Sequence, residues 1–89
     1  HWRAVAVDFE RPILCLKENQ GLAWSGCSDG FIRAYDVLSL KEVLSQQLHK
    51  KKKVTHLCCI KDAIWSGGAD GDVIVAKVKE KKHGKFNLE

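Results

Sequence analysis

The chain has 89 residues, of which 45% are hydrophobic and 29% charged, and its formal net charge is +4. This balance is typical of one small globular domain and excludes a disordered chain. Since no apolar run approaches the roughly 18 residues that a bilayer requires, we expect no membrane-spanning helix. The basic excess is local: residues 49–89 hold ten lysines against five acidic residues, whereas residues 1–48 hold five basic and six acidic ones.

Short apolar segments bounded by polar residues predict strands along the whole chain, and no segment has a convincing helical period. Asp29-Gly30 and Asp70-Gly71 each predict a hairpin turn, because the Asp side chain caps the turn and Gly adopts a positive φ at low cost. The continuously apolar run at 73–76 predicts a strand that is covered on both faces. The nine expected strands lie within residues 3–9, 13–16, 22–25, 31–37, 41–48, 55–60, 63–66, 72–78 and 85–89.

The sequence repeats itself with an offset of 41 residues. Residues 24–30 (WSGCSDG) align without a gap with residues 65–71 (WSGGADG), and five of the seven positions are identical. The match extends in both directions, with Leu16 aligned to Leu57 and Val37 to Val78. A period of about 40 to 45 residues is typical of a four-stranded propeller blade.

Residues 22–36 resemble the signature of the WD40-repeat family, in which a strand ends in Ser-Gly-Ser, an Asp-containing turn follows, and the next strand ends in Trp-Asp. Here Tyr35-Asp36 stands in the Trp-Asp place. The resemblance implies an all-β fold made of WD40-like β-propeller blades, present as a partial propeller. Residues 1–9 would hold the last strand of a preceding blade, 13–48 the first blade and 54–89 the second. Roughly three or more repeats are needed for stability, so we expect either a segment of a larger propeller of six to eight blades or, alternatively, several copies that close one ring.

The resemblance also implies a set of structural residues. Blades of this family are tied by hydrogen bonds among His, Ser, Asp and Trp. The corresponding turn and network positions in this chain are Ser25, Asp29, Tyr35, His49, Ser66 and Asp70. Neither unit has the full set, because Asp8 stands where the first His would fall and Ala76 replaces the second Trp. The repeats are therefore divergent.

Other reactive residue types have a structural interpretation. Trp24 and Trp65 recur at equivalent strand positions, which favours packing in the core over ligand binding. We expect His56 to be a polar core or channel residue. The four cysteines are interpreted as reduced thiols of an intracellular, cytoplasmic protein, because no secretory signal precedes them. They are Cys15, Cys27, Cys58 and Cys59.

The candidate partner-binding residues are Lys50, Lys51, Lys52 and Lys53, in the loop that joins the two expected blades. The resemblance places such loops on the commonly used binding face. The local positive charge would attract an acidic protein segment, an anionic membrane surface or a nucleic acid, and charge alone does not choose among them. The absence of interleaved aromatic residues disfavours single-stranded nucleic acid.

The predicted function is a protein-interaction scaffold that docks partner proteins. No catalytic, cofactor-binding or metal-ligating residue is predicted, and we expect the chain not to be an enzyme: candidate reactive residues are either repeated or isolated, and no glycine-rich phosphate loop precedes a helix. The alternative is a small basic β-barrel that binds nucleic acid or anionic surfaces. The identity of the partner, the number of blades and any attached catalytic domain stay open.

Overall fold

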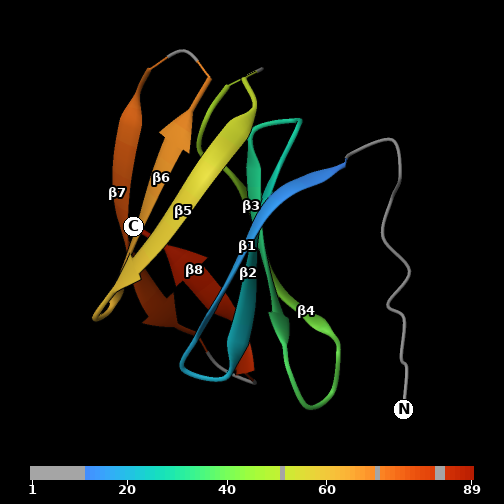
Figure 1. Ribbon diagram of the computed structural model, residues 1–89. Helices are drawn as coiled ribbons and strands as arrows, with labels where there is room; N and C mark the ends of the chain where they lie inside the picture. Colours follow the sequence, from blue (N-terminus) through green and yellow to red (C-terminus); the bar gives the residue numbers. More distant parts are fainter. Residues whose placement is uncertain (1–11, 51, 70, 82–83) are drawn as a thin grey trace.

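The computed structural model describes residues 12–50, 52–69, 71–81 and 84–89, and it shows an all-β arrangement (Figure 1). The described strands form two four-stranded antiparallel sheets, and in each sheet the strands neighbour one another in chain order. The first sheet consists of β1 (Ile13–Asn19), β2 (Leu22–Cys27), β3 (Phe31–Asp36) and β4 (Glu42–Gln47). The second sheet consists of β5 (Val54–Ile60), β6 (Ala63–Gly68), β7 (Val73–Glu80) and β8 (Phe86–Leu88). The all-β expectation is confirmed, while the strand expected at 3–9 lies outside the described residues.

The 41-residue repeat of the sequence is also a repeat of the structure. Strands β1 and β5 begin at Ile13 and Val54, and in each the register with the next strand shifts directly after its first residue. The turns that follow adopt the same backbone conformation, since Gln20 and Lys61 both have a φ of 54°. The registers agree as well: Leu16 is paired with Ser25 in the first sheet, as Leu57 is with Ser66 in the second.

Each sheet has two faces, because successive side chains of a strand point to opposite sides. We call the face that bears Trp24 in the first sheet, and Trp65 in the second, the front face. We call the face that bears Leu16 in the first sheet, and Leu57 in the second, the back face. Each front face is thus related to the other by the 41-residue offset, and so is each back face.

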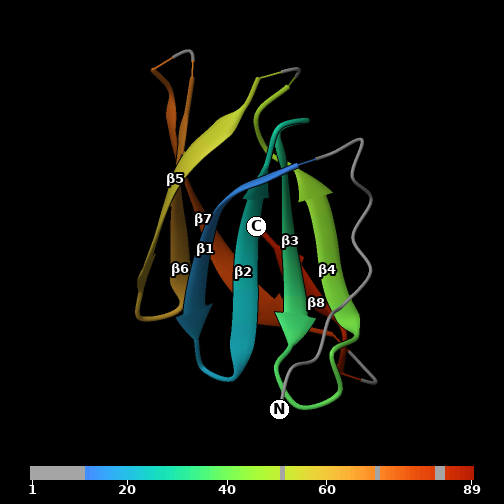
Figure 2. The same cartoon turned by 45° about the vertical axis from the view of Figure 1, so that its right-hand side comes forward.

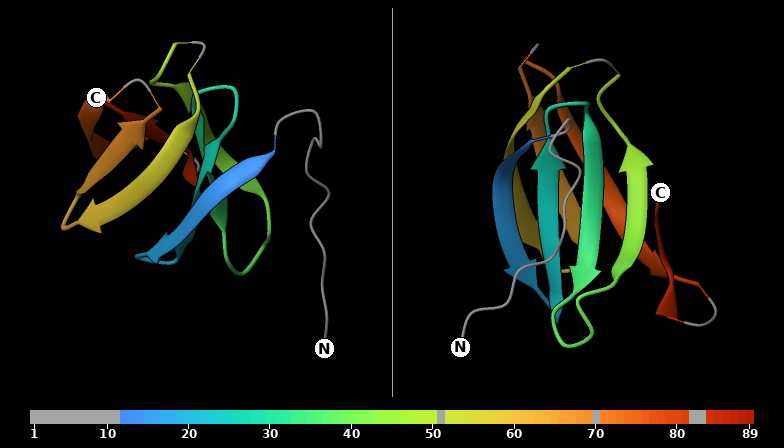
Figure 3. Two further views of the ribbon diagram at one scale, coloured as in Figure 1. Left: turned by 45° about the horizontal axis from the view of Figure 1, so that its top comes forward. Right: turned by 90° about the vertical axis from the view of Figure 1, so that its right-hand side faces the viewer.

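The core lies between the front face of the first sheet and the back face of the second (Figures 2 and 3). The first sheet contributes Leu22, Trp24, Ile32, Ala34 and Leu44, and the second contributes Leu57, Ile64, Ala76 and Leu88. A glycine permits the close approach of the two sheets: a Cβ atom on Gly26 would lie 2.5 Å from Cγ1 of Val54. The two sheets therefore stack front to back.

Three expectations about burial are wrong for the second sheet. Trp24 is in the core at 1% exposure, but Trp65 is 42% exposed. The apolar run in β7 is covered on one face only, since Val73 and Val75 are 65% and 49% exposed. His56, expected in a core or channel, is also exposed. The physical reason is the same for all four residues: they lie on the front face of the second sheet, which no described residue covers.

No helix among the described residues is long and apolar enough to cross a membrane.

Candidate functional site

The basic loop joins β4 to β5 at one end of the two sheets. Lys50, Lys52 and Lys53 are exposed, and Lys51 lies outside the described residues. Figure 1 shows this loop at the same end of the molecule as the β2–β3 and β6–β7 connections. The loop therefore presents at least three lysines beside two hairpin turns.

Backbone hydrogen bonds hold the loop in place. The N–H groups of Leu48 and His49 both donate to the carbonyl oxygen of Gly30, at 3.1 Å each. On the other side, the N–H of Ala69 donates to the carbonyl oxygen of Lys53 at 2.9 Å. The two ends of the loop are thus fastened to the two hairpin turns.

A buried histidine anchors the same loop to the second sheet. His49 is 2% exposed, and its Nε2 lies 2.8 Å from Oγ of Ser66. That hydroxyl also donates to the carbonyl oxygen of Ile74 at 3.4 Å. Which of the two side chains donates the 2.8 Å bond depends on the tautomer of the imidazole. Among the described residues, Nδ1 of His49 has no hydrogen-bond partner. Asp70, which the resemblance places in this network, lies outside the described residues.

The first sheet repeats part of this arrangement around Ser25. Oγ of Ser25 donates to the carbonyl oxygen of Arg33 at 3.0 Å, which is the equivalent of the Ser66–Ile74 bond. Asp29 caps its turn by accepting the N–H of Phe31 at 3.2 Å. The guanidinium of Arg33 donates to both carboxylate oxygens of Asp29, at 3.3 and 3.0 Å, and lies 4.6 Å from the centre of the Phe31 ring.

The ion pair changes the titration of both side chains. Burial alone would raise the pKa of Asp29, but the hydrogen bonds from Arg33 and from the backbone of Phe31 outweigh it and hold that pKa below its ordinary value. Burial would lower the pKa of Arg33, but its hydrogen bonds to Asp29 raise it further above its ordinary value. The pair therefore stays ionised at the base of the lysine loop. Sequence reasoning missed Arg33, since β7, the equivalent strand of the second repeat, has Ile74 at this position and no family signature marks it.

Tyr35 makes no side-chain hydrogen bond to the other predicted network residues that the structure describes. It lies on the back face of the first sheet, opposite Ala23 and Glu42 in the strand ladders. Desolvation, and then the negative charge of Glu42, raise the pKa of its hydroxyl. The structure therefore brings His49 to Ser66 and bonds both Asp29 and Ser25 to Arg33, while Tyr35 shares the face of Ser25 without a side-chain hydrogen bond to these residues.

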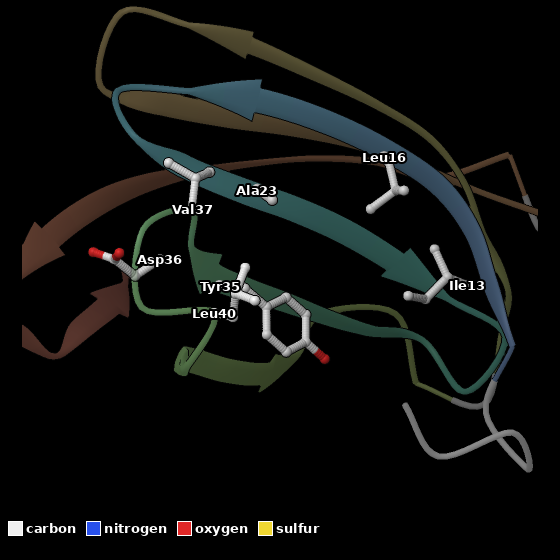
Figure 4. A pocket seen from close by; sticks show the side chains of 7 residues that line it. All are labelled: Ile13, Leu16, Ala23, Tyr35, Asp36, Val37 and Leu40. Atoms are coloured by element: carbon white, nitrogen blue, oxygen red, sulfur yellow. The ribbon is translucent and has the colours of Figure 1, made fainter. Parts of the chain in front are cut away.

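Tyr35 borders a hollow on the back face of the first sheet, with a volume of about 280 Å³ (Figure 4). Its lining is mostly apolar and comes from β1, β2, β3 and the β3–β4 turn. The lining residues are Ile13, Leu16, Ala23, Tyr35, Asp36, Val37 and Leu40. The only sequence signal that could have located this hollow is the small Ala23, at the position that Ile64 fills in the second repeat.

The described residues contain no group of three or more His, Cys, Asp or Glu side chains placed to hold a metal ion. All four cysteines are free thiols. Cys58 is exposed and Cys59 half-buried, on opposite faces of β5.

Comparison with known proteins gives no relative. No protein-family model, no curated protein and no solved structure matches this chain.

Proposed function

We propose that this chain is a WD40-like propeller segment that serves as a protein-interaction scaffold and docks acidic segments of partner proteins on Lys50, Lys51, Lys52 and Lys53. The observation that carries the proposal is the exposed lysine loop, held by hydrogen bonds between two consecutive sheets that share one 41-residue repeat. Four-stranded sheets repeated at this period and stacked on one another are the arrangement expected of propeller blades.

The electrostatics of the loop support an acidic partner. Asp29 lies in the β2–β3 turn at the same end of the sheets, and its carboxylate is already paired with the guanidinium of Arg33 at 3.0 Å. A loop whose backbone is fixed before binding loses less conformational entropy on binding than a free one. The lysines can therefore attract an acidic segment at low ordering cost, through an interaction that salt screens.

The alternative function is weakened in one respect. A small closed β-barrel would join its strands into one continuous sheet, whereas the described strands fall into two sheets of four. Nucleic-acid binding through the same lysines remains an outcome that the experiment must separate from protein binding.

The test compares two triple variants that remove the same charge from opposite ends of the sheets. Lys50, Lys52 and Lys53 are replaced by Ser in one variant, and Lys41, Lys61 and Lys81 in the other; all six lysines are exposed. Binding of a fluorescent oligoglutamate peptide is measured by anisotropy at low salt. Since each exposed charge contributes about 0.5 kcal/mol, we expect the loop variant to bind about tenfold more weakly.

The control variant should lose much less affinity. An equal loss in both variants would show attraction by net charge alone and would refute a site at the loop. A single-stranded oligonucleotide is titrated in parallel: if it binds more tightly than the peptide and depends on the same three lysines, the nucleic-acid function replaces the scaffold.

A further inference from the structure

The front face of the second sheet is apolar and exposed. It presents Trp65, Val73 and Val75 at 42%, 65% and 49% exposure, with the exposed thiol of Cys58 beside them. Single exposed apolar residues need no explanation, but adjacent ones on one sheet face mark an interaction surface. Trp65 is opposite both Cys58 and Val75 in the ladders, so these side chains are neighbours.

The repeat shows what kind of surface covers such a face. The equivalents of Trp65, Val73 and Val75 in the first sheet are Trp24, Ile32 and Ala34, which are 1%, 0% and 0% exposed. They are covered by the back face of the second sheet, through Leu57, Ile64 and Ala76. Within one molecule, a front face of this repeat is thus buried by a back face of the same repeat.

Part of the back face of the first sheet, around Leu16, is also exposed among the described residues. Leu16 is 60% exposed, whereas its equivalent Leu57 is 5% exposed. The hollow of about 280 Å³ lies on this face, and Figure 4 shows Leu16, Ala23 and Tyr35 around it. These three residues are the equivalents of Leu57, Ile64 and Ala76, the residues that cover the front face of the first sheet. The hollow is therefore located where an aromatic side chain from a front face would be received.

The charges around the two open faces are of opposite sign. Strand alternation places Lys77 and Lys79 on the same face as Trp65, and both are exposed. Alternation places Glu18 on the face of Leu16, and Glu42 is opposite Tyr35 in the β3–β4 ladder. Both glutamates are exposed. Complementary charges at the edge of an apolar contact favour this pairing over the pairing of two identical faces.

We infer that the chain binds a second copy of itself head to tail, with the front face of the second sheet of one copy on the back face of the first sheet of the next, and with Trp65 in the hollow beside Tyr35. The contact is heterologous, so further copies can add until a ring closes or a filament grows. This inference does not depend on the lysine loop, which lies at the strand ends and outside both faces.

The test measures the mass of the full 89-residue chain by sedimentation velocity over a range of concentrations. We expect the mass to rise above the 10.0 kDa of one chain as concentration increases. Trp65→Glu and Leu16→Glu each introduce a charge into one of the two faces, and each should weaken association about thirtyfold or more, as loss of an interface hot spot does. Lys61→Glu places the same side chain in the exposed β5–β6 turn, outside both faces, and should leave association unchanged. Near-UV circular dichroism from the buried Trp24 reports that each variant is folded.

Mixing the two face variants distinguishes a head-to-tail contact from a symmetric one. Trp65→Glu keeps an intact back face and Leu16→Glu an intact front face, so the mixture should form a 1:1 dimer that neither variant forms alone. A wild-type chain that stays monomeric at every concentration would overturn the inference. So would association that survives either substitution, or a mixture that remains monomeric.

Discussion

At the residue scale, the ion pair of Arg33 and Asp29 is the polar contact whose removal should matter most in the first sheet. The guanidinium is almost buried and holds both carboxylate oxygens. We expect Arg33→Met to lower the free energy of unfolding by about 2 kcal/mol at neutral pH, because the variant removes a guanidinium that donates two hydrogen bonds to a half-buried carboxylate. Lys41→Met, which removes one exposed charge, should change it by less than about 0.5 kcal/mol.

The same pair predicts a pH dependence. Since the pKa of Asp29 is lowered on folding, the pair stabilises the native state fully above the unfolded pKa of about 3.9, and this contribution is lost as the pH falls through the native value. The difference in urea midpoint between wild type and Arg33→Met should therefore be largest at pH 7 and shrink below about pH 4. A difference that stays constant down to pH 3 would mean that the side chain stabilises the sheet by packing on Phe31 rather than by its charge.

Individual residues also show where sequence reasoning stops. The repeat and the turn signals predict a capping Asp29, which the structure shows bonded to the N–H of Phe31. They do not predict the role of Arg33. Its contribution to stability depends on an ion pair with a residue four positions away and on burial, and neither can be read from a single sequence. Nor do they predict the exposure of Trp65, since a repeated sequence position is not a repeated environment when only one of the two faces is covered.

At the scale of elements, the two Asp-Gly turns differ in what lies against them. Gly30 and Gly71 have nearly the same φ, 85° and 88°. A Cβ atom on Gly30 would collide with the carbonyl oxygen of His49, whereas one on Gly71 would meet nothing within 4 Å. The loop that leads to the next sheet thus packs directly against Gly30 of the first turn. Among the described residues, nothing packs against Gly71 of the second turn.

This pair of turns gives a matched experiment. Gly71→Ala should cost about 1 kcal/mol, because alanine is strained at a positive φ. Gly30→Ala should cost about 2 kcal/mol more, because the added methyl group also displaces the loop that donates two hydrogen bonds to Gly30. Urea unfolding followed by circular dichroism measures both values. If both variants lose the same free energy of unfolding, the connecting loop moves aside for the added methyl group at no cost. The lysines on the loop would then not be held in place as the proposed docking site requires.

At the scale of the whole molecule, the strand pattern could be predicted from the sequence but the stacking could not. Apolar runs and Asp-Gly turns predict eight strands within the described residues, and the structure has strands at each of these places. Which face of a sheet is buried depends on what packs against it. A strand with apolar residues on both faces, such as 73–76, therefore does not indicate which face is covered. The front-to-back order rests on particular close contacts, such as Val54 against Gly26.

The front-to-back stacking of the two sheets predicts that the two equivalent tryptophans contribute differently to stability. Trp24 fills the space between the sheets, so Trp24→Ala should lower the free energy of unfolding by about 3 to 5 kcal/mol, the usual cost of emptying an aromatic core position. In a domain of this size such a loss can unfold the chain outright. Trp65→Ala, at a protein concentration where the chain is monomeric, should cost less than about 1 kcal/mol, because that side chain packs on one sheet only.

The comparison separates two explanations for the repeated tryptophan. If the side chain stabilises each sheet from within, through its cross-strand neighbours, both substitutions should cost about the same. If it acts between sheets, only Trp24→Ala is severe in the monomer, and Trp65→Ala becomes costly when association buries the second front face. The cost of Trp65→Ala should then grow with protein concentration while that of Trp24→Ala does not, because binding to the native state alone adds stability by mass action.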